Sequence, residues 1–178
     1  MPPKKPHLEI ELKVLDIDHQ GILRILSKHG IVPRVQDQED FVVLPGPREV
    51  VRVRKMKDRS VLTYKHRIRQ GRFKVAQETE FEVSDAEAAI RVITRLCAGM
   101  EYYRYKKHRR IFEMNGVKCD LIELPPLKPY LELEGPPEAI EKTILDLGLS
   151  KFATSSKGIP QLLVDAGVGP ETLGPSDR

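Results

Sequence analysis

The sequence near the N-terminus alternates strictly between polar and apolar residues from His7 to Val14 (HLEIELKV). Because the side chains of a β-strand point to opposite faces with a period of two, this alternation predicts a strand. Its polar face carries Glu9, Glu11 and Lys13. Taken alone, such a strand is typical of the solvated face of an antiparallel sheet. The alternation limits the possible folds because it recurs along the chain and so predicts many strands with one polar and one apolar face.

Further strands are predicted wherever this alternation returns, namely over 49–56, 61–69, 72–83, 101–114, 117–124 and 130–134, with an irregular strand over 31–44. Asn115-Gly116 is the strongest hairpin turn signal. Three amphipathic helices are expected between the strands. The first is capped by Asp16 or Asp18, the second opens with a capping box at residues 84–87, and the third begins at Pro136-Pro137. Few helices among many strands indicate an α+β fold rather than a βαβ series.

Size and composition suit a single globular domain, because 178 residues with 40% hydrophobic and 31% charged residues can bury a sizeable core. We expect the domain to span residues 1–164 and the Gly-, Pro- and Ser-rich residues 165–178 to form a loose tail. The sequence shows no secretory signal and no apolar run of membrane-spanning length. Cys97 and Cys119 are interpreted as reduced thiols, which favours a cytoplasmic location.

Roughly eight antiparallel strands have one apolar and one charged face, and a closed barrel is able to turn the charged faces inward. Such a barrel encloses a charged tunnel, with the apolar faces outside and partly covered by the helices. The alternative is that cross-strand ion pairs simply decorate a solvated surface. The acidic positions are Glu9, Glu11, Glu78, Glu80, Asp120, Glu132 and Glu134, and the basic positions are Lys13, Arg52, Arg54, Lys65, Arg67, Lys107 and Arg109.

A tunnel of this kind has to compensate its charges, because burying an unpaired charge is costly. Carboxylates with no His or Cys cluster indicate a hard cation, Mg²⁺ or Mn²⁺. A polyphosphate binds both partners, since its oxygens accept hydrogen bonds from Arg and Lys and also bridge a metal ion. The net charge of +4 is compatible with a polyanionic ligand. The charge pattern therefore predicts a site for metal and triphosphate.

The ordered series of charged motifs resembles the CYTH family, the triphosphate tunnel metalloenzymes. The family's ExExK hallmark is matched by Glu9-Ile10-Glu11-Leu12-Lys13, and the resemblance extends to about residue 150. The other matching segments are Val51-Arg52-Val53-Arg54, Leu62-Thr63-Tyr64-Lys65, Glu78-Thr79-Glu80, Lys107-His108-Arg109, Asp120 and Glu132-Leu133-Glu134.

The resemblance implies an eight-stranded antiparallel β-barrel tunnel with flanking helices and the substrate phosphates inside. Divalent metal would be held by Glu9, Glu11, Asp120, Glu132 and Glu134. The triphosphate would be bound by Lys13, Arg52, Arg54, Lys65, Lys107 and Arg109, and the charge pattern adds Arg67. Catalytic roles fall to Lys65 and Arg52, which would stabilise developing charge, and to Glu78 and Glu80, which would order the basic side chains or assist a second metal or the water.

The function expected first is divalent-metal-dependent hydrolysis of a small-molecule triphosphate, either tripolyphosphate, thiamine triphosphate or a nucleoside triphosphate. A class IV adenylyl cyclase, which converts ATP to cyclic AMP and pyrophosphate in the same kind of tunnel, is the second possibility. A non-catalytic module that binds polyphosphate or nucleic acid is the third. Nucleic acid is disfavoured because metal-free carboxylates repel phosphate. Membrane association is not expected, and a homodimer remains open.

Overall fold

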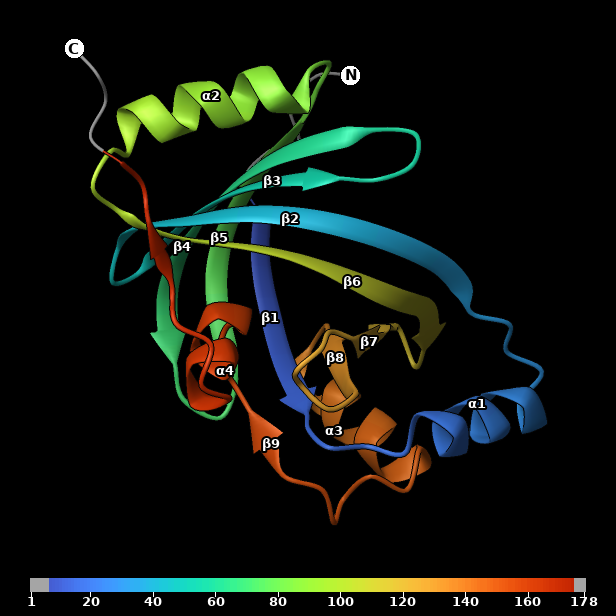
Figure 1. The fold of residues 1–178 in the computed structure, drawn as a ribbon. Helices are drawn as coiled ribbons and strands as arrows, with labels where there is room; N and C mark the ends of the chain where they lie inside the picture. Colours follow the sequence, from blue (N-terminus) through green and yellow to red (C-terminus); the bar gives the residue numbers. More distant parts are fainter. Residues whose placement is uncertain (1–6, 175–178) are drawn as a thin grey trace.

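The structure is a computed structural model that describes residues 7–174, and a single antiparallel sheet dominates it (Figure 1). Its strands are β1 (His7–Val14), β2 (Arg34–Gly46), β3 (Glu49–Lys55), β4 (Ser60–Gln70), β5 (Lys74–Val83), β6 (Glu101–Met114), β7 (Val117–Glu123), β8 (Tyr130–Glu134), β9 (Thr154–Ser155) and β10 (Glu171–Thr172). The helices are α1 (His19–Lys28), α2 (Ala86–Leu96), α3 (Pro137–Asp146) and α4 (Ile159–Asp165).

Eight of these strands close into a barrel. Their order is β6-β2-β3-β4-β5-β1-β8-β7, and the pairing of β6 with β7 completes the ring. The two short strands lie outside the ring, with β9 paired to β1 and β10 paired to β6. Because every neighbouring pair is antiparallel, short turns such as Asn115-Gly116 connect most of them. The predicted eight-stranded α+β barrel is therefore confirmed.

The strands turn their apolar faces outward, where helices cover them. Helices α1 and α3 pack with the outer faces of β1, β7 and β8 in one cluster that includes Leu12, Leu121 and Leu133. Helix α2 covers β2 and β3 in a second cluster around Phe41 and Val53. Figure 1 shows α2 on one side of the barrel and α1 with α3 near the opposite end. The hydrophobic core thus lies around the barrel, which leaves its inside for polar groups.

Local structure differs from the sequence-based expectation at two places. Strand β2 runs from Arg34 to Gly46, and the middle that the sequence indicated as irregular pairs continuously with β6 from Arg34 to Leu44. Its one irregularity is a register shift against β3 between Val43 and Gly46. The N-cap of α2 is Asp85, whose Oδ1 accepts from the backbone N–H of Ala88 at 2.9 Å. The expected capping box placed the cap one residue earlier, at Ser84.

The C-terminal segment is more ordered than its composition predicts. Residues 159–165 form α4, which the sequence indicated only by some apolar content. Beyond it, β10 pairs with Glu101 and Tyr102 of β6, and Leu173 packs into the cluster beneath α2 at 5% exposure. The prediction of a loose tail from residue 165 is therefore wrong for residues 171–173, which tertiary packing holds in place. Residues 175–178 of that predicted tail lie outside the described residues.

No helix within residues 7–174 is both long enough and apolar enough to cross a membrane.

Candidate functional site

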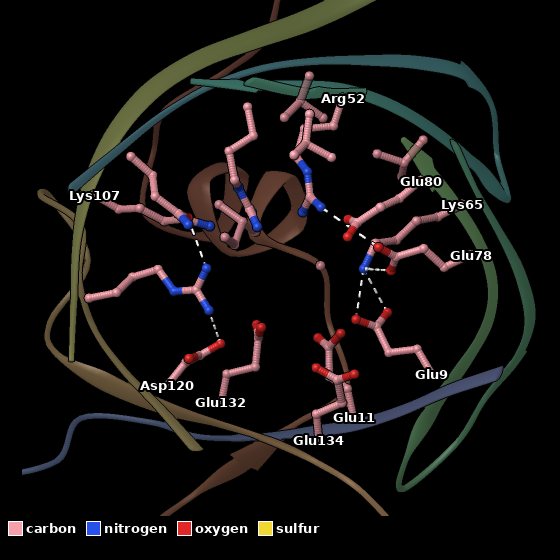
Figure 2. A pocket seen from close by; sticks show the side chains of 18 of the residues that line it. Glu9, Glu11, Arg52, Lys65, Glu78, Glu80, Lys107, Asp120, Glu132 and Glu134 are labelled. Atoms are coloured by element: carbon pink, nitrogen blue, oxygen red, sulfur yellow. Dashed lines mark hydrogen bonds and ion pairs between the residues drawn. The ribbon is translucent and has the colours of Figure 1, made fainter. Parts of the chain in front are cut away.

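The inside of the barrel holds a cavity of about 470 Å³ (Figure 2). Its wall is formed by the polar faces of the eight barrel strands. Within the described chain, ten Lys and Arg side chains and seven Asp and Glu side chains line it, so the cavity carries an excess of positive charge that suits a polyanion. The basic set is Lys13, Arg34, Arg52, Arg54, Arg59, Lys65, Lys74, Lys107, Arg109 and Lys118, and the acidic set is Glu9, Glu11, Glu78, Glu80, Asp120, Glu132 and Glu134.

The structure brings together thirteen of the fourteen charged residues that the sequence singled out, and Arg67 is the exception. Arg67 has the same strand phase as Lys65, but it lies beyond the cavity lining. Its guanidinium donates to the carbonyl oxygen of Pro47 and to Oε1 of Gln70, and a register shift in β4 follows directly. These contacts hold Arg67 beside the β2–β3 turn, so its expected place among the cavity residues is wrong.

Lys65 stands at the centre of one ionic cluster. Its Nζ lies 2.7 Å from a carboxylate oxygen of Glu9 and 2.5 Å from one of Glu78. Burial disfavours the charged amine, but Glu9 reverses this effect and the pKa of Lys65 is raised. Arg52 joins the cluster through Glu78 at 4.0 Å and donates to Oγ1 of Thr63 at 3.1 Å. Figure 2 shows these side chains, with Glu80, converging from β1, β3, β4 and β5.

Two pairs of carboxylates on β1, β7 and β8 form a second group in the cavity wall. Glu11 of β1 lies directly across from Glu134 of β8, and Asp120 of β7 lies directly across from Glu132 of β8. Like charges in directly opposed positions destabilise a sheet unless a cation compensates them. Lys13 and Lys74 contact Glu11, Lys13 also contacts Glu132, Lys118 contacts Glu134, and Arg109 contacts Asp120.

The amine of Lys13 is the most enclosed of these cations, since its side chain is only 1% exposed. Burial lowers the pKa of an amine, but the carboxylates of Glu11 and Glu132 outweigh this effect and raise the pKa of Lys13. Glu132 responds in the opposite sense. Burial favours its neutral form, yet Lys13 and Lys74 bring its pKa well below the usual range. Both groups are therefore charged at neutral pH.

The donor set fits a hard divalent cation by its chemistry. Glu9, Glu11, Asp120, Glu132 and Glu134 offer only carboxylate oxygens, the ligands that Mg²⁺ and Mn²⁺ prefer. Oδ1 of Asp120 is buried and has no hydrogen-bond partner, so this oxygen is available to a ligand. In residues 7–174 no three acidic, His or Cys side chains are already grouped as a metal cluster, because Lys and Arg occupy the space between the carboxylates.

Several polar side chains line the cavity but were not assigned to it from the sequence, namely Arg34, Gln36, Gln38, Arg59, Lys74 and Lys118. Lys74 shares the strand phase of Glu78 and Glu80, so period-two alternation within the expected strand over 72–83 identifies it. Gln36 and Gln38 stand in a continuous run of polar residues over 36–40, where alternation between polar and apolar residues gives no signal.

The two ends of the cavity differ. Gly158, Ile159 and Pro160 at the start of α4 line one end, where Ile159 packs with Tyr105 and the neighbouring apolar residues. Figure 2 shows a helix across the far end of the barrel. Lining residues near the other end include the exposed side chains of Arg34 and Arg59. One end of the cavity is thus lined by apolar residues of α4, and basic side chains lie near the other end.

The tyrosines of β6 pack within the protein. Tyr103 is 5% exposed and lies in a cluster with Val42 and Leu163. The ring of Tyr102 lies 5.4 Å from that of Phe41, beneath α2. Single-stranded nucleic acid is usually bound on exposed aromatic side chains, so this arrangement gives no support to a nucleic-acid interface on β6.

Comparison with solved structures identifies similar folds. The PH1012 protein of Pyrococcus horikoshii is 28% identical to this chain, with 80% of this chain and 92% of that protein covered and a TM-score of 0.71. A conserved hypothetical protein of Pyrococcus furiosus is 23% identical, with 85% and 97% covered and a TM-score of 0.75. A candidate adenylyl cyclase from Hippeastrum with a dominant triphosphatase activity is 15% identical, with 92% and 97% covered and a TM-score of 0.63.

No protein-family model matches the sequence, and no curated protein matches it either. The likeness to these solved structures is therefore one of fold. The closed eight-stranded barrel agrees with the tunnel fold that the resemblance to the CYTH family implies.

Proposed function

We propose that this chain hydrolyses a small-molecule triphosphate inside its tunnel with the help of Mg²⁺ or Mn²⁺. The observation that carries the proposal is that one cavity is lined by an excess of Lys and Arg together with two pairs of directly opposed carboxylates. The cations match the phosphate oxygens, and the carboxylate pairs match the metal ions that accompany a triphosphate in water. The triphosphatase activity of the Hippeastrum protein supports the same reaction class.

The basic side chains bind and orient the phosphate chain. Arg52 and Arg54 on β3, Lys65 on β4 and Arg109 on β6 point into one space, and their guanidinium forks and amine fit phosphate oxygens. Since negative charge on these oxygens changes as the terminal phosphoryl group is transferred, Arg52 and Lys65 stabilise the transition state electrostatically. Glu9 and Glu78 hold Lys65 between them and so fix its direction.

The carboxylates of Glu9, Glu11, Asp120, Glu132 and Glu134 would hold the divalent cation. When bound, it supplies charge neutralisation of the phosphate oxygens and a water molecule of lowered pKa. Glu78 and Glu80 lie beside Arg52 and Lys65, where they would order the cationic side chains and offer oxygens that accept a hydrogen bond from an attacking water. The buried wall keeps other water away from the phosphate chain.

Hydrolysis rather than cyclisation is proposed because the lining offers little aromatic surface. A cyclase has to recognise adenine, and nucleic-acid bases commonly stack on aromatic side chains. Among the described lining residues, Tyr105 is the only Phe, Tyr or Trp, and it packs with Ile159 at the start of α4. The apolar lining residues near Arg34, such as its strand partner Ile111, are aliphatic.

A substrate screen tests the proposal. Tripolyphosphate, thiamine triphosphate and ATP would each be incubated with the protein and Mg²⁺ or Mn²⁺, and the products separated by ion exchange. We expect phosphate and the corresponding diphosphate, and no turnover after chelation with EDTA. Cyclic AMP and pyrophosphate from ATP would instead establish the cyclase reaction. Tight polyphosphate or RNA binding that survives EDTA, with no turnover of any substrate, would establish a non-catalytic binding module.

A further inference from the structure

One buried carboxylate lies beside the tunnel without lining the cavity. Asp40 lies on β2 and is 0% exposed, although a carboxylate is among the most costly groups to bury. Two cations from the strands on either side of β2 compensate it. Nε and Nη2 of Arg54, on β3, donate to Oδ1 and Oδ2 at 2.8 and 3.1 Å. Nζ of Lys107, on β6, lies 3.0 Å from Oδ2.

These three residues, here called the Asp40 cluster (Asp40, Arg54 and Lys107), carry one net positive charge. Both cations line the cavity, whereas Asp40 lies behind them in the wall and does not line it. The two-point contact with Arg54 fixes the plane of its guanidinium, because a fork of two parallel hydrogen bonds permits one orientation. The contact with Lys107 ties that amine to the same carboxylate. One acidic side chain thereby sets the position of two phosphate-binding candidates from different strands.

The charge of Lys107 depends on Asp40 more than the charge of Arg54 does. Burial and the charge of Arg54 lower the pKa of Lys107 to about 7, while Asp40 raises it. An amine in this position changes charge near neutrality, whereas a guanidinium does not. The charged groups that act on Lys107 come from β2, β3, β6 and β8 and are Asp40, Arg52, Arg54, Arg109 and Glu132.

We propose that Asp40 is a positioning residue of the phosphate site, which orients Arg54 and keeps Lys107 protonated so that both present their charge to the triphosphate. The inference rests on the proposed function for the identity of the ligand. Asp40 itself does not line the cavity, and it contacts the site only through Arg54 and Lys107. A merely structural Asp40 would hold β2, β3 and β6 together without affecting how Arg54 and Lys107 bind the triphosphate.

The first test measures the charge of Lys107 without any substrate. The protein would be labelled with ¹³Cε-lysine, the Lys107 signal assigned by its loss in Lys107→Arg, and the chemical shift followed by NMR from pH 5 to pH 10. We expect a pKa near 7 in the unaltered protein. In Asp40→Asn it should fall by about 1 to 3 pH units, because the opposite charge at 3.0 Å is removed. An unchanged pKa would overturn the inference.

The second test measures turnover against pH with the triphosphate identified by the screen. For Asp40→Asn we expect KM to rise about 10-fold or more, because a charge-assisted hydrogen bond to phosphate is lost at neutral pH. The fall of kcat/KM at alkaline pH, the alkaline limb of its pH profile, should also move to lower pH. In a Lys107→Arg background the same substitution should leave that limb in place, since Arg stays charged. A limb that moves equally in both backgrounds would contradict the role given to Lys107.

Matched variants separate positioning from folding. Asp37 lies on the same strand with its side chain 85% exposed, and it contacts only His108 in the ion pairs of the described chain. Asp37→Asn should therefore leave KM and the pH profile unchanged. If Asp40→Asn does not fold, Arg54→Gln tests the cluster from the other side, because removing this neighbouring positive charge should raise the pKa of Lys107. A fall or no change in that variant would count against the inference.

The two proposals fail separately. If no triphosphate is hydrolysed but Lys107 titrates as expected in both variants, the proposed function is wrong and the charge coupling of the Asp40 cluster stands. If a triphosphate is hydrolysed and the Lys107 pKa does not respond to Asp40→Asn, the function stands and the positioning role is wrong.

Discussion

At the scale of single residues, the strongest expectation concerns Lys65. Its amine is held between Glu9 and Glu78 and faces the cavity together with Arg52. Loss of one such charge from a preorganised site costs about 10²- to 10³-fold in kcat. We therefore expect Lys65→Ala and Arg52→Ala each to reduce kcat by about that factor, as measured with the triphosphate and metal identified by the screen.

Arg67 provides the matched control for this prediction. It lies two residues beyond Lys65 on the same strand, and its guanidinium contacts Pro47 and Gln70 outside the cavity lining. Arg67→Ala should retain kcat and KM within about twofold, because surface substitutions away from a site have small effects. A loss comparable with that of Lys65→Ala would return Arg67 to the site where its strand phase first placed it.

The sequence was informative about single residues wherever alternation continued without a break. Glu9, Lys65 and Glu132 were located by phase alone, because a strand places every second side chain on one face. Asp40 was given no role in the site, because the residues that follow it, Phe41, Val42 and Val43, form a continuous apolar run. That run arises because Val42 faces the closed end of the tunnel while its two neighbours face α2. The positions of α2 and α4 in three dimensions explain why apolar residues stand on both faces of the strand here.

At the scale of elements, the start of α2 offers a direct test. Asp85 caps the helix through the backbone N–H of Ala88, whereas the capping box expected from the sequence assigned this role to Ser84. Removing an N-cap costs about 1 kcal/mol of stability. Asp85→Ala should therefore lower the free energy of unfolding by about 1 kcal/mol in urea denaturation, while Ser84→Ala should change it by less than about 0.5 kcal/mol. The reverse order would favour the capping box.

Element prediction failed where an element depends on distant partners. The seven residues of α4 have too few turns to form a stable helix in isolation. The helix exists because Ile159 and Leu163 pack against the end of the barrel. Likewise, β10 is two residues long and pairs with β6, more than sixty positions earlier in the chain. Neither feature leaves a local signal of period two or 3.6 long enough to detect.

At the scale of the whole molecule, the excess positive charge of the cavity predicts stabilisation by anions. A ligand that binds only the folded state raises the free energy of unfolding by RT ln(1 + [L]/Kd), which is about 2.7 kcal/mol at 100 times Kd. We expect tripolyphosphate to raise the melting temperature even in EDTA, although less than it does with Mg²⁺. Differential scanning fluorimetry would measure this shift.

The control for this experiment is a variant with fewer cationic groups in the wall. The double substitution Arg52→Ala and Lys65→Ala should remove most of the shift, because the charges that contact phosphate are lost. An equal shift in that variant would show that the anion binds elsewhere, for example at exposed basic residues outside the barrel. High salt should weaken binding at such exposed residues more than binding in the enclosed cavity.

Helix α4, which crosses one end of the barrel, also bears on the sequence of product departure. If the proposed hydrolysis takes place in the tunnel and α4 restricts passage at its end, substrate would enter and products would leave past Arg34 and Arg59. The product nearer that opening would then leave first, and release of the deeper product would limit how soon the next substrate binds.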